Sequence, residues 1–284
     1  MPRCADDTCG RWRPDLTSIE RLAGASVRKM GALQFNGLWY CSRECVEHAA
    51  RTGLNENASR TRTSSGLPPL KLGVLLRHAG AVTQSELESA LAASARTGLR
   101  IGQQLEQLGY TTSVDVLRAL ATQAGVSYFS TFDVARVERG PVSMPAPTVR
   151  ALGLVPFEAD EVLRRLSVIC AAPVPKSAVR ALTRLTGWVP EVYLVTDSMF
   201  QTALDAYKPA RGTQASHQTL TFKNLGAAAA HVADVAANER AVTMRHADCN
   251  DYRWVRVQGP QRVSDLLVSS AREERGCQAE LTAH

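Results

Sequence analysis

The chain has 284 residues, 45% of them apolar and 21% charged, and its 33 basic and 27 acidic residues leave a net charge of +6. This ordinary globular composition excludes a wholly disordered or fibrous chain, and the length predicts one to three domains. The basic balance favours a polyanionic partner such as nucleic acid, a nucleotide or an anionic membrane, although basic residues spread over several domains would give the same net charge.

The sequence shows neither a membrane span nor a common nucleotide-binding motif. Its most apolar run, 225–235, is mostly alanine and is interrupted by His231 and Asp234. The first residues include Asp6 and Asp7, whereas a signal peptide has an apolar segment there. We therefore expect a cytoplasmic protein. The P-loop, the dinucleotide-binding glycine motif and the Gly-x-Ser-x-Gly motif are absent, so we expect no enzyme.

Polar segments divide the chain into three parts. The stretches 51–69 and 208–218 are rich in Ser, Thr, Gly and Pro and predict linkers. We expect a module over 1–50, a central domain over 70–207 and a module over 219–284. The predicted fold class is α+β and multidomain. It comprises a small zinc finger, helical tandem hairpins followed by a small α/β subdomain, and a small C-terminal α+β module.

The first module contains two pairs of cysteines, which are Cys4, Cys9, Cys41 and Cys45. In a chain with seven cysteines and no export signal, metal ligation or free thiols are expected rather than disulfides. The second pair follows a strand around an Asn36-Gly37 turn and opens a helix, which is a treble-clef-like arrangement. The four cysteines predict a zinc site that holds the fold, with His48 as a substitute ligand. Ordinary thiols are the alternative interpretation.

The central region contains a tandem sequence repeat. The glycines and aliphatic residues of 71–94 recur twenty-nine residues later in 100–123. Each copy predicts a short helix, a glycine turn and a second helix, and the second helices begin at the capping residues Thr83 and Thr112. Two helical hairpins whose leucines form a core would also explain the aliphatic positions.

Together with segments as far as Tyr207, the tandem motif resembles the N-terminal (MshEN-type) domain of type II secretion and type IV pilus assembly ATPases. The resemblance covers about half of the chain and implies binding of cyclic di-GMP, whose two-fold symmetry suits two similar hairpins. The second half-site implied by the resemblance comprises Arg100, Ile101, Gly102, Leu105, Gly109, Val116, Leu120 and Gln123. The first comprises Lys71, Leu72, Gly73, Leu76, Gly80, Leu87 and Leu91.

The first copy departs from the family motif at two positions. Lys71 stands where the motif has arginine and lacks a planar guanidinium, and Ser94 stands where the second copy has Gln123. We therefore expect the second copy to dominate the binding of cyclic di-GMP.

The last module predicts a helix over 225–237 that is followed by strands over 241–247, 252–258 and 263–268. The spacing of His231, His246 and Cys249 matches no known metal site. The sequence assigns no function to this module.

The predicted function is a non-enzymatic, cyclic di-GMP-responsive adaptor or regulator related to type II secretion or type IV pilus machinery. Its expected partners are cyclic di-GMP and secretion or pilus assembly proteins, and its expected metal is Zn²⁺. Two alternatives stay open. One is a nucleic-acid-binding regulator that uses the zinc finger and the basic surface, and the other is a ligand-free protein-docking scaffold.

Overall fold

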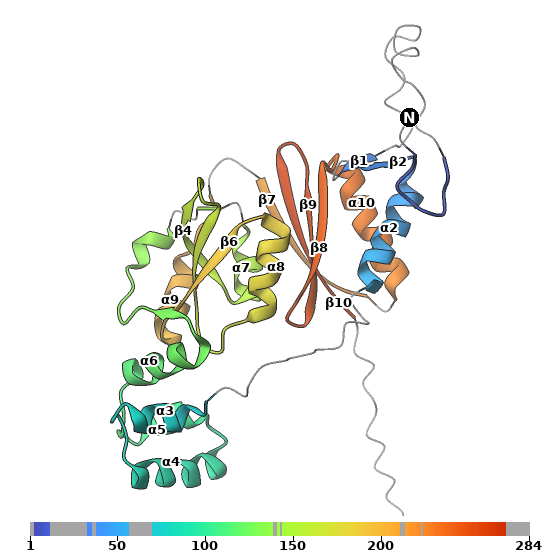
Figure 1. The fold of residues 1–284 in the computed structure, drawn as a ribbon. Helices are drawn as coiled ribbons and strands as arrows, with labels where there is room; N and C mark the ends of the chain where they lie inside the picture. The colour runs from blue at the N-terminus through green and yellow to red at the C-terminus, as the bar shows by residue number, and fades with distance from the viewer. Residues whose placement is uncertain are drawn as a thin grey trace, which may run out of the picture.

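The computed structural model describes residues 3–11, 33–35, 38–56, 70–138, 141–142, 144–210, 214–222 and 224–270. These residues form an α+β molecule with several groups of elements, as predicted from the sequence (Figure 1). No helix in this part of the chain has the length and apolar character needed to cross a bilayer.

The twice-written motif forms two helical hairpins, α3 (Leu72–His78) with α4 (Gln84–Thr97) and α5 (Ile101–Gln107) with α6 (Ser113–Ala124). Thr83 forms a capping box at the start of α4, and the Thr112 side chain accepts a hydrogen bond from the third residue of α6. Gly80 and Gly109, with φ of 71° and 72°, end the two short helices in the left-handed conformation. The predicted helix–turn–helix pattern is confirmed in both copies.

The hairpins lead into a four-stranded sheet with the order β3-β6-β5-β4. β5 is antiparallel to β4 and parallel to β6, and β3 is parallel to β6. Apolar side chains of the sheet and its helices form the largest core among the described residues. The elements are β3 (Ser127–Tyr128), η2 (Val134–Val137), α7 (Ala146–Leu152), β4 (Val155–Asp160), β5 (Arg165–Cys170), α8 (Lys176–Thr186), β6 (Val189–Leu194) and α9 (Asp197–Ala206).

The C-terminal part is a second four-stranded sheet with the order β7-β10-β9-β8. Its elements are β7 (Gln214–Phe222), α10 (Leu225–Asn238), β8 (Thr243–Cys249), β9 (Tyr252–Gln258) and β10 (Arg262–Ser270). β7 begins inside the segment 208–218 that the sequence assigns to a linker. Its polar residues conceal the strand because β7 lies at the edge of the sheet, where its backbone pairs with β10 and its side chains stay partly exposed.

The N-terminal part contains β1 (Leu33–Phe35), β2 (Leu38–Tyr40) and α2 (Arg43–Glu56), with β1 antiparallel to β2. The predicted Asn36-Gly37 turn lies outside the described residues. α2 runs into the segment 51–69 that the sequence assigns to a linker. The helix continues because Leu54 is buried, only 3% exposed, in a core that the polar composition of this segment does not reveal.

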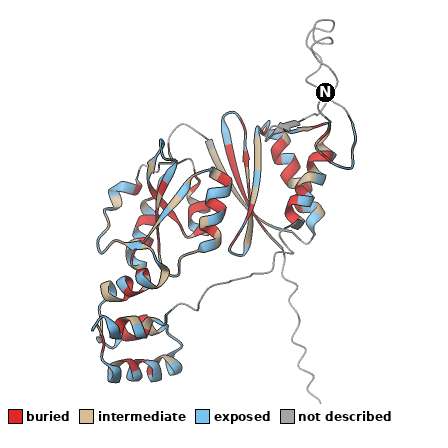
Figure 2. Cartoon of the chain, viewed as in Figure 1, coloured by how far each residue is buried: buried red, intermediate tan, exposed pale blue. Residues whose placement is uncertain are grey.

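This second core joins the two ends of the chain. Val46, Ala50 and Leu54 of α2 share it with α10 and with inward-facing residues of β9 and β10. Figure 2 shows buried residues along α2, α10 and the neighbouring strands. The other face of the same sheet carries Trp254 and Leu267 into the central core. The C-terminal sheet therefore lies between α10 and the central helices, and it packs against both.

Candidate metal centre and tandem-hairpin site

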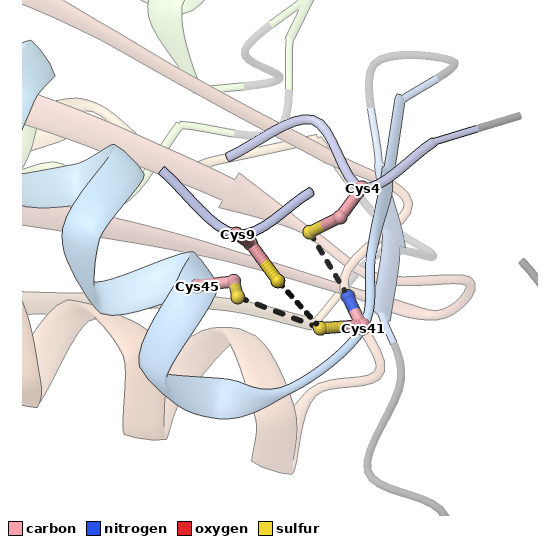
Figure 3. Close-up of side chains that lie close together, drawn as sticks. All are labelled: Cys4, Cys9, Cys41 and Cys45. Atoms are coloured by element: carbon pink, nitrogen blue, oxygen red, sulfur yellow. Dashed lines mark hydrogen bonds between the residues drawn. The ribbon is translucent and has the colours of Figure 1, made fainter. Parts of the chain in front are cut away.

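The four predicted cysteines converge on one point (Figure 3). The Sγ atom of Cys41 lies 3.3 Å from that of Cys9 and 3.5 Å from that of Cys45, and all four sulfurs lie within 4.8 Å of one another. Zinc–sulfur bonds of about 2.3 Å in a tetrahedron place sulfurs about 3.8 Å apart. The group therefore fits a tetrahedral zinc ion, and no other set of three potential ligands gathers among the described residues.

Local backbone structure positions these ligands. The Cys4 N–H donates to the Arg11 carbonyl at 2.7 Å, which closes the loop that contains the first pair. Cys41 follows β2, and its N–H donates to the Cys4 sulfur at 3.4 Å. Cys45 lies in the first turn of α2 and accepts a hydrogen bond from the Ser42 hydroxyl at 3.6 Å. N–H and O–H donors to sulfur are characteristic of thiolates that hold a metal.

His48, considered as a substitute ligand, has a different partner. Its Nδ1 lies 2.9 Å from Oδ1 of Asp6, which is 6% exposed. Asp6 also accepts hydrogen bonds from the backbone N–H and hydroxyl of Thr8, at 3.0 and 2.7 Å. Although burial acts to raise the pKa of Asp6, these hydrogen bonds and the nearby histidine hold that pKa below its ordinary value. Asp6 therefore fixes the loop between Cys4 and Cys9 and the side chain of His48.

Burial opposes ionisation of Cys41 and Cys45, whereas hydrogen bonds, first from the backbone of Arg11 and then from Cys41, lower the pKa of Cys9. Desolvation raises the pKa of Cys45 and of Cys41 above the ordinary value of a thiol. Free thiols at these positions are protonated at neutral pH, and a divalent cation would supply the charge that stabilises them as thiolates. Four sulfur ligands leave zinc no open position, so the chemistry it would provide here is structural.

In the tandem hairpins, the two copies exchange hydrogen bonds crosswise. The hydroxyl of Ser94, from the first copy, donates to the carbonyl of Leu99 at the start of the second copy, at 2.6 Å. The amide of Gln123, from the second copy, donates to the carbonyl of Leu70 at the start of the first. Both donors and both acceptors are related by the twenty-nine-residue repeat. The two contacts are equivalent in the repeat, although Ser94 and Leu99 are 5 residues apart in the chain and Gln123 and Leu70 are 53 apart.

The basic residues of the motif lie beside these contacts. Lys71 is the N-cap residue of α3 and Arg100 that of α5, and both side chains are exposed. Arg100 directly follows Leu99, whose carbonyl accepts from Ser94, and Lys71 directly follows Leu70, whose carbonyl accepts from Gln123. The assignment of Arg100 and Gln123 to one half-site stays a prediction.

Many of the other motif residues hold the hairpins together. Leu76 and Leu105 are completely buried, and Leu87 and Val116 are buried beside them. The motif residues with exposed or partly exposed side chains are Lys71, Leu72, Leu91, Arg100, Ile101, Leu120 and Gln123. The surface that a ligand can reach is therefore a subset of the motif.

The two helical glycines allow close contact between helices. A Cβ at Gly73 would lie 2.7 Å from Cδ1 of Leu87, and one at Gly102 would lie 2.9 Å from Cγ1 of Val116. The resemblance places both glycines in the ligand site, and in this structure the absence of a Cβ at each lets the neighbouring helix of the same hairpin approach closely.

Sequence reasoning missed two exposed residues at this surface. Leu70 and Leu99, which precede the basic residues, are 63% and 37% exposed, and their carbonyls accept the crossed hydrogen bonds. Their recurrence at the twenty-nine-residue interval was the available signal.

Comparison with known proteins supports the resemblance inferred from the motif. No protein-family model matches the chain. The type IV pilus assembly ATPase PilB of Thermus thermophilus is 26% identical over 142 residues, which are 50% of this chain and 16% of PilB. The predicted resemblance to this family is confirmed, and it concerns a small part of the length of PilB.

Two solved structures were also matched. A structure of MshE with cdg is 26% identical, with a TM-score of 0.39, and the match covers 49% of this chain and 99% of that one. A structure of the N-terminal domain of XpsE is 15% identical, with a TM-score of 0.35, and the match covers 48% and 92% of the two chains.

Proposed function

We propose that this chain is a non-enzymatic adaptor that binds cyclic di-GMP at its tandem hairpins and acts with type II secretion or type IV pilus machinery. The tandem motif and the similarity to PilB support the proposal. The sequence contains no P-loop, so the adaptor carries no nucleotide-hydrolysing motif of that kind.

The observation that carries the proposal is the crossed pair of hydrogen bonds. Ser94 with Leu99 and Gln123 with Leu70 give the hairpins an approximate two-fold relation. Cyclic di-GMP also has two-fold symmetry, so its two halves would meet equivalent groups of the two copies. The guanidinium of Arg100 would stack on a guanine or form charge-assisted hydrogen bonds to it.

Zinc has a supporting role in this adaptor. It would hold the loop of residues 3–11 against β2 and the first turn of α2, and α2 in turn packs on α10. The metal thus stabilises the part of the molecule that lies across the C-terminal sheet from the hairpins.

Calorimetric titration with cyclic di-GMP tests the proposal. Arg100→Ala should weaken binding about ten- to a hundredfold, because it removes a charge-assisted contact. Lys71→Ala should weaken it less, since an ammonium gives neither stacking nor a bidentate fork. Arg96→Ala, at an exposed arginine in the last turn of α4, is the matched control and should change nothing.

Ser94→Gln tests the crossed arrangement specifically. It would restore to the first copy the amide that Gln123 provides in the second, and we expect it to strengthen binding. Equal and negligible effects of Arg100→Ala and Lys71→Ala on a measurable affinity would place the ligand elsewhere. Complete absence of binding by the folded wild-type chain would leave the hairpins as a protein-docking scaffold.

A further inference from the structure

Helix α8 carries a row of basic side chains along its outward face. Lys176, Arg180 and Arg184 follow one another at four-residue intervals, and all three are exposed. Four residues advance a helix by about 6 Å, so these side chains line one stripe. The helix contains no acidic residue, and no ion pair among the described residues joins the three to a carboxylate. The row therefore presents uncompensated positive charge.

The hairpin between β4 and β5 exposes aliphatic side chains at its tip. Val162 is 92% exposed and Leu163 is 58% exposed. The turn is ordered, because Oδ1 of Asp160 accepts hydrogen bonds from the backbone N–H groups of Val162 and Leu163 at 3.0 and 2.9 Å. Val189, at the start of the neighbouring strand β6, is 56% exposed as well. Apolar side chains held in water by an ordered turn indicate a contact surface.

Arg164 connects the helix with the hairpin. Its guanidinium lies over the ring of Trp188, 4.6 Å from the centroid. Its Nη2 is 3.7 Å from the position that a Cβ would occupy at Gly187, the residue that ends α8 just after Arg184. The basic row and the aliphatic tip are therefore continuous. We call this surface the basic–apolar face, made of Lys176, Arg180, Arg184, Arg164, Val162 and Leu163.

We propose that the basic–apolar face binds the surface of an anionic lipid bilayer. Exposed aliphatic side chains enter the interfacial region, and neighbouring basic groups are attracted to lipid phosphates. The acidic residues at the tip are Asp160, whose Oδ1 is used within the turn, and Glu161, and they are outnumbered by the four basic residues of the face. Trp188, with its amphipathic ring beside the tip, also suits a bilayer interface.

The apolar tip distinguishes a bilayer from a nucleic acid. A phosphodiester backbone would satisfy the charges of Lys176, Arg180 and Arg184 and would leave Val162 and Leu163 without an apolar partner. A lipid surface uses the charge and the apolar tip together. This binding is separate from the tandem hairpins and does not depend on cyclic di-GMP.

Flotation of the full chain with lipid vesicles tests the proposal. We expect binding to vesicles of equal parts phosphatidylglycerol and phosphatidylcholine and none to phosphatidylcholine alone. The double variant Arg180→Ala with Arg184→Ala should weaken binding about thirtyfold. Val162→Asp should also weaken it, and Arg96→Ala, which removes an exposed arginine of α4, should leave it unchanged. Circular dichroism of each variant verifies folding, since every substituted side chain is exposed.

Three results would overturn the proposal. The first is no flotation of folded wild-type chain with the anionic vesicles. The second is binding that survives the double arginine variant and Val162→Asp. The third is binding of duplex DNA that is lost in the arginine variant but retained in Val162→Asp, without vesicle binding, which would assign α8 to a nucleic acid instead.

Discussion

Removal of zinc should loosen the C-terminal helix and sheet as well as the cysteine-bearing loop. Cys41→Ser removes the sulfur that lies nearest to those of Cys9 and Cys45 and should release the metal. The start of α2 then loses its anchor, and Val46 and Leu54, 0% and 3% exposed, lose their fixed position against α10. Burying a valine or a leucine contributes about 1.5–3 kcal/mol, so undocking both would cost about 3–6 kcal/mol. We use about 4 kcal/mol, because the undocked chain keeps part of its apolar surface covered.

Hydrogen exchange measured by mass spectrometry tests this coupling. A local loss of about 4 kcal/mol accelerates exchange of the amides that depend on it about a thousandfold. We expect this acceleration in α10 when zinc-loaded protein is compared with Cys41→Ser, and no change in α4 to α6. Cys277→Ser, which removes a cysteine that the sequence analysis does not count among the metal ligands, is the control. Accelerated exchange in α2 with unchanged exchange in α10 would refute the coupling through the shared core. Metal analysis that finds no zinc in freshly purified, reduced wild-type protein would refute the zinc site itself.

Three further predictions concern the fold. Burial lowers the pKa of His217, so the unfolded chain binds more protons than the folded chain, and stability falls as the pH drops below about 6.5. His217→Gln should flatten this part of a plot of Tm against pH. An unchanged slope would contradict the prediction. Gly102→Ala gains about 1 kcal/mol of helix propensity, but its Cβ crowds the rigid Val116 side chain at a cost of about 1–3 kcal/mol. We therefore expect a net loss of stability in urea unfolding. A gain in stability would show that the two helices can move apart at little cost. Thr83→Ala should cost about 0.5–2 kcal/mol in the same assay through loss of the capping box, and no change would mean that the cap is dispensable.

Local patterns in the sequence predicted the elements whose causes are local. Thr83 with Glu86 three residues later predicts a helix start, and Gly80 predicts the end of the preceding helix, because capping depends on residues within one turn. The pairs of cysteines predicted a common ligand group for the same reason, since tight turns bring each pair together. The repeat itself predicted that 71–94 and 100–123 have the same structure.

The sequence did not predict contacts between distant segments. The sequence assigns Leu54 to a polar linker, whereas in the structure it is buried in a core that it shares with α10. The strand that starts at Gln214 is recognised only by its pairing with β10. The crossed hydrogen bonds were missed because the repeat shows which positions are equivalent. It does not show whether a side chain forms its hydrogen bond within its own copy or with the other copy. The sequence therefore marked Ser94 only as a departure from Gln123, and it did not show that its hydroxyl donates to the carbonyl of Leu99.

The packing of α6 has a consequence for how the hairpins communicate with the rest of the molecule. Val116 and Ala119 belong to the core of the hairpins, and Leu117 and Ala121 belong to the core of the central sheet. Leu120, which the resemblance assigns to the ligand site, packs against both cores. Because packed cores shift between discrete arrangements, a ligand that moves Leu120 must repack the contacts of α6 with the central sheet. Trp254 and Leu267 extend that same core into the C-terminal sheet. The hairpins are thus connected to the sheet that carries α10 through continuous side-chain packing, which begins at a residue of the candidate ligand site.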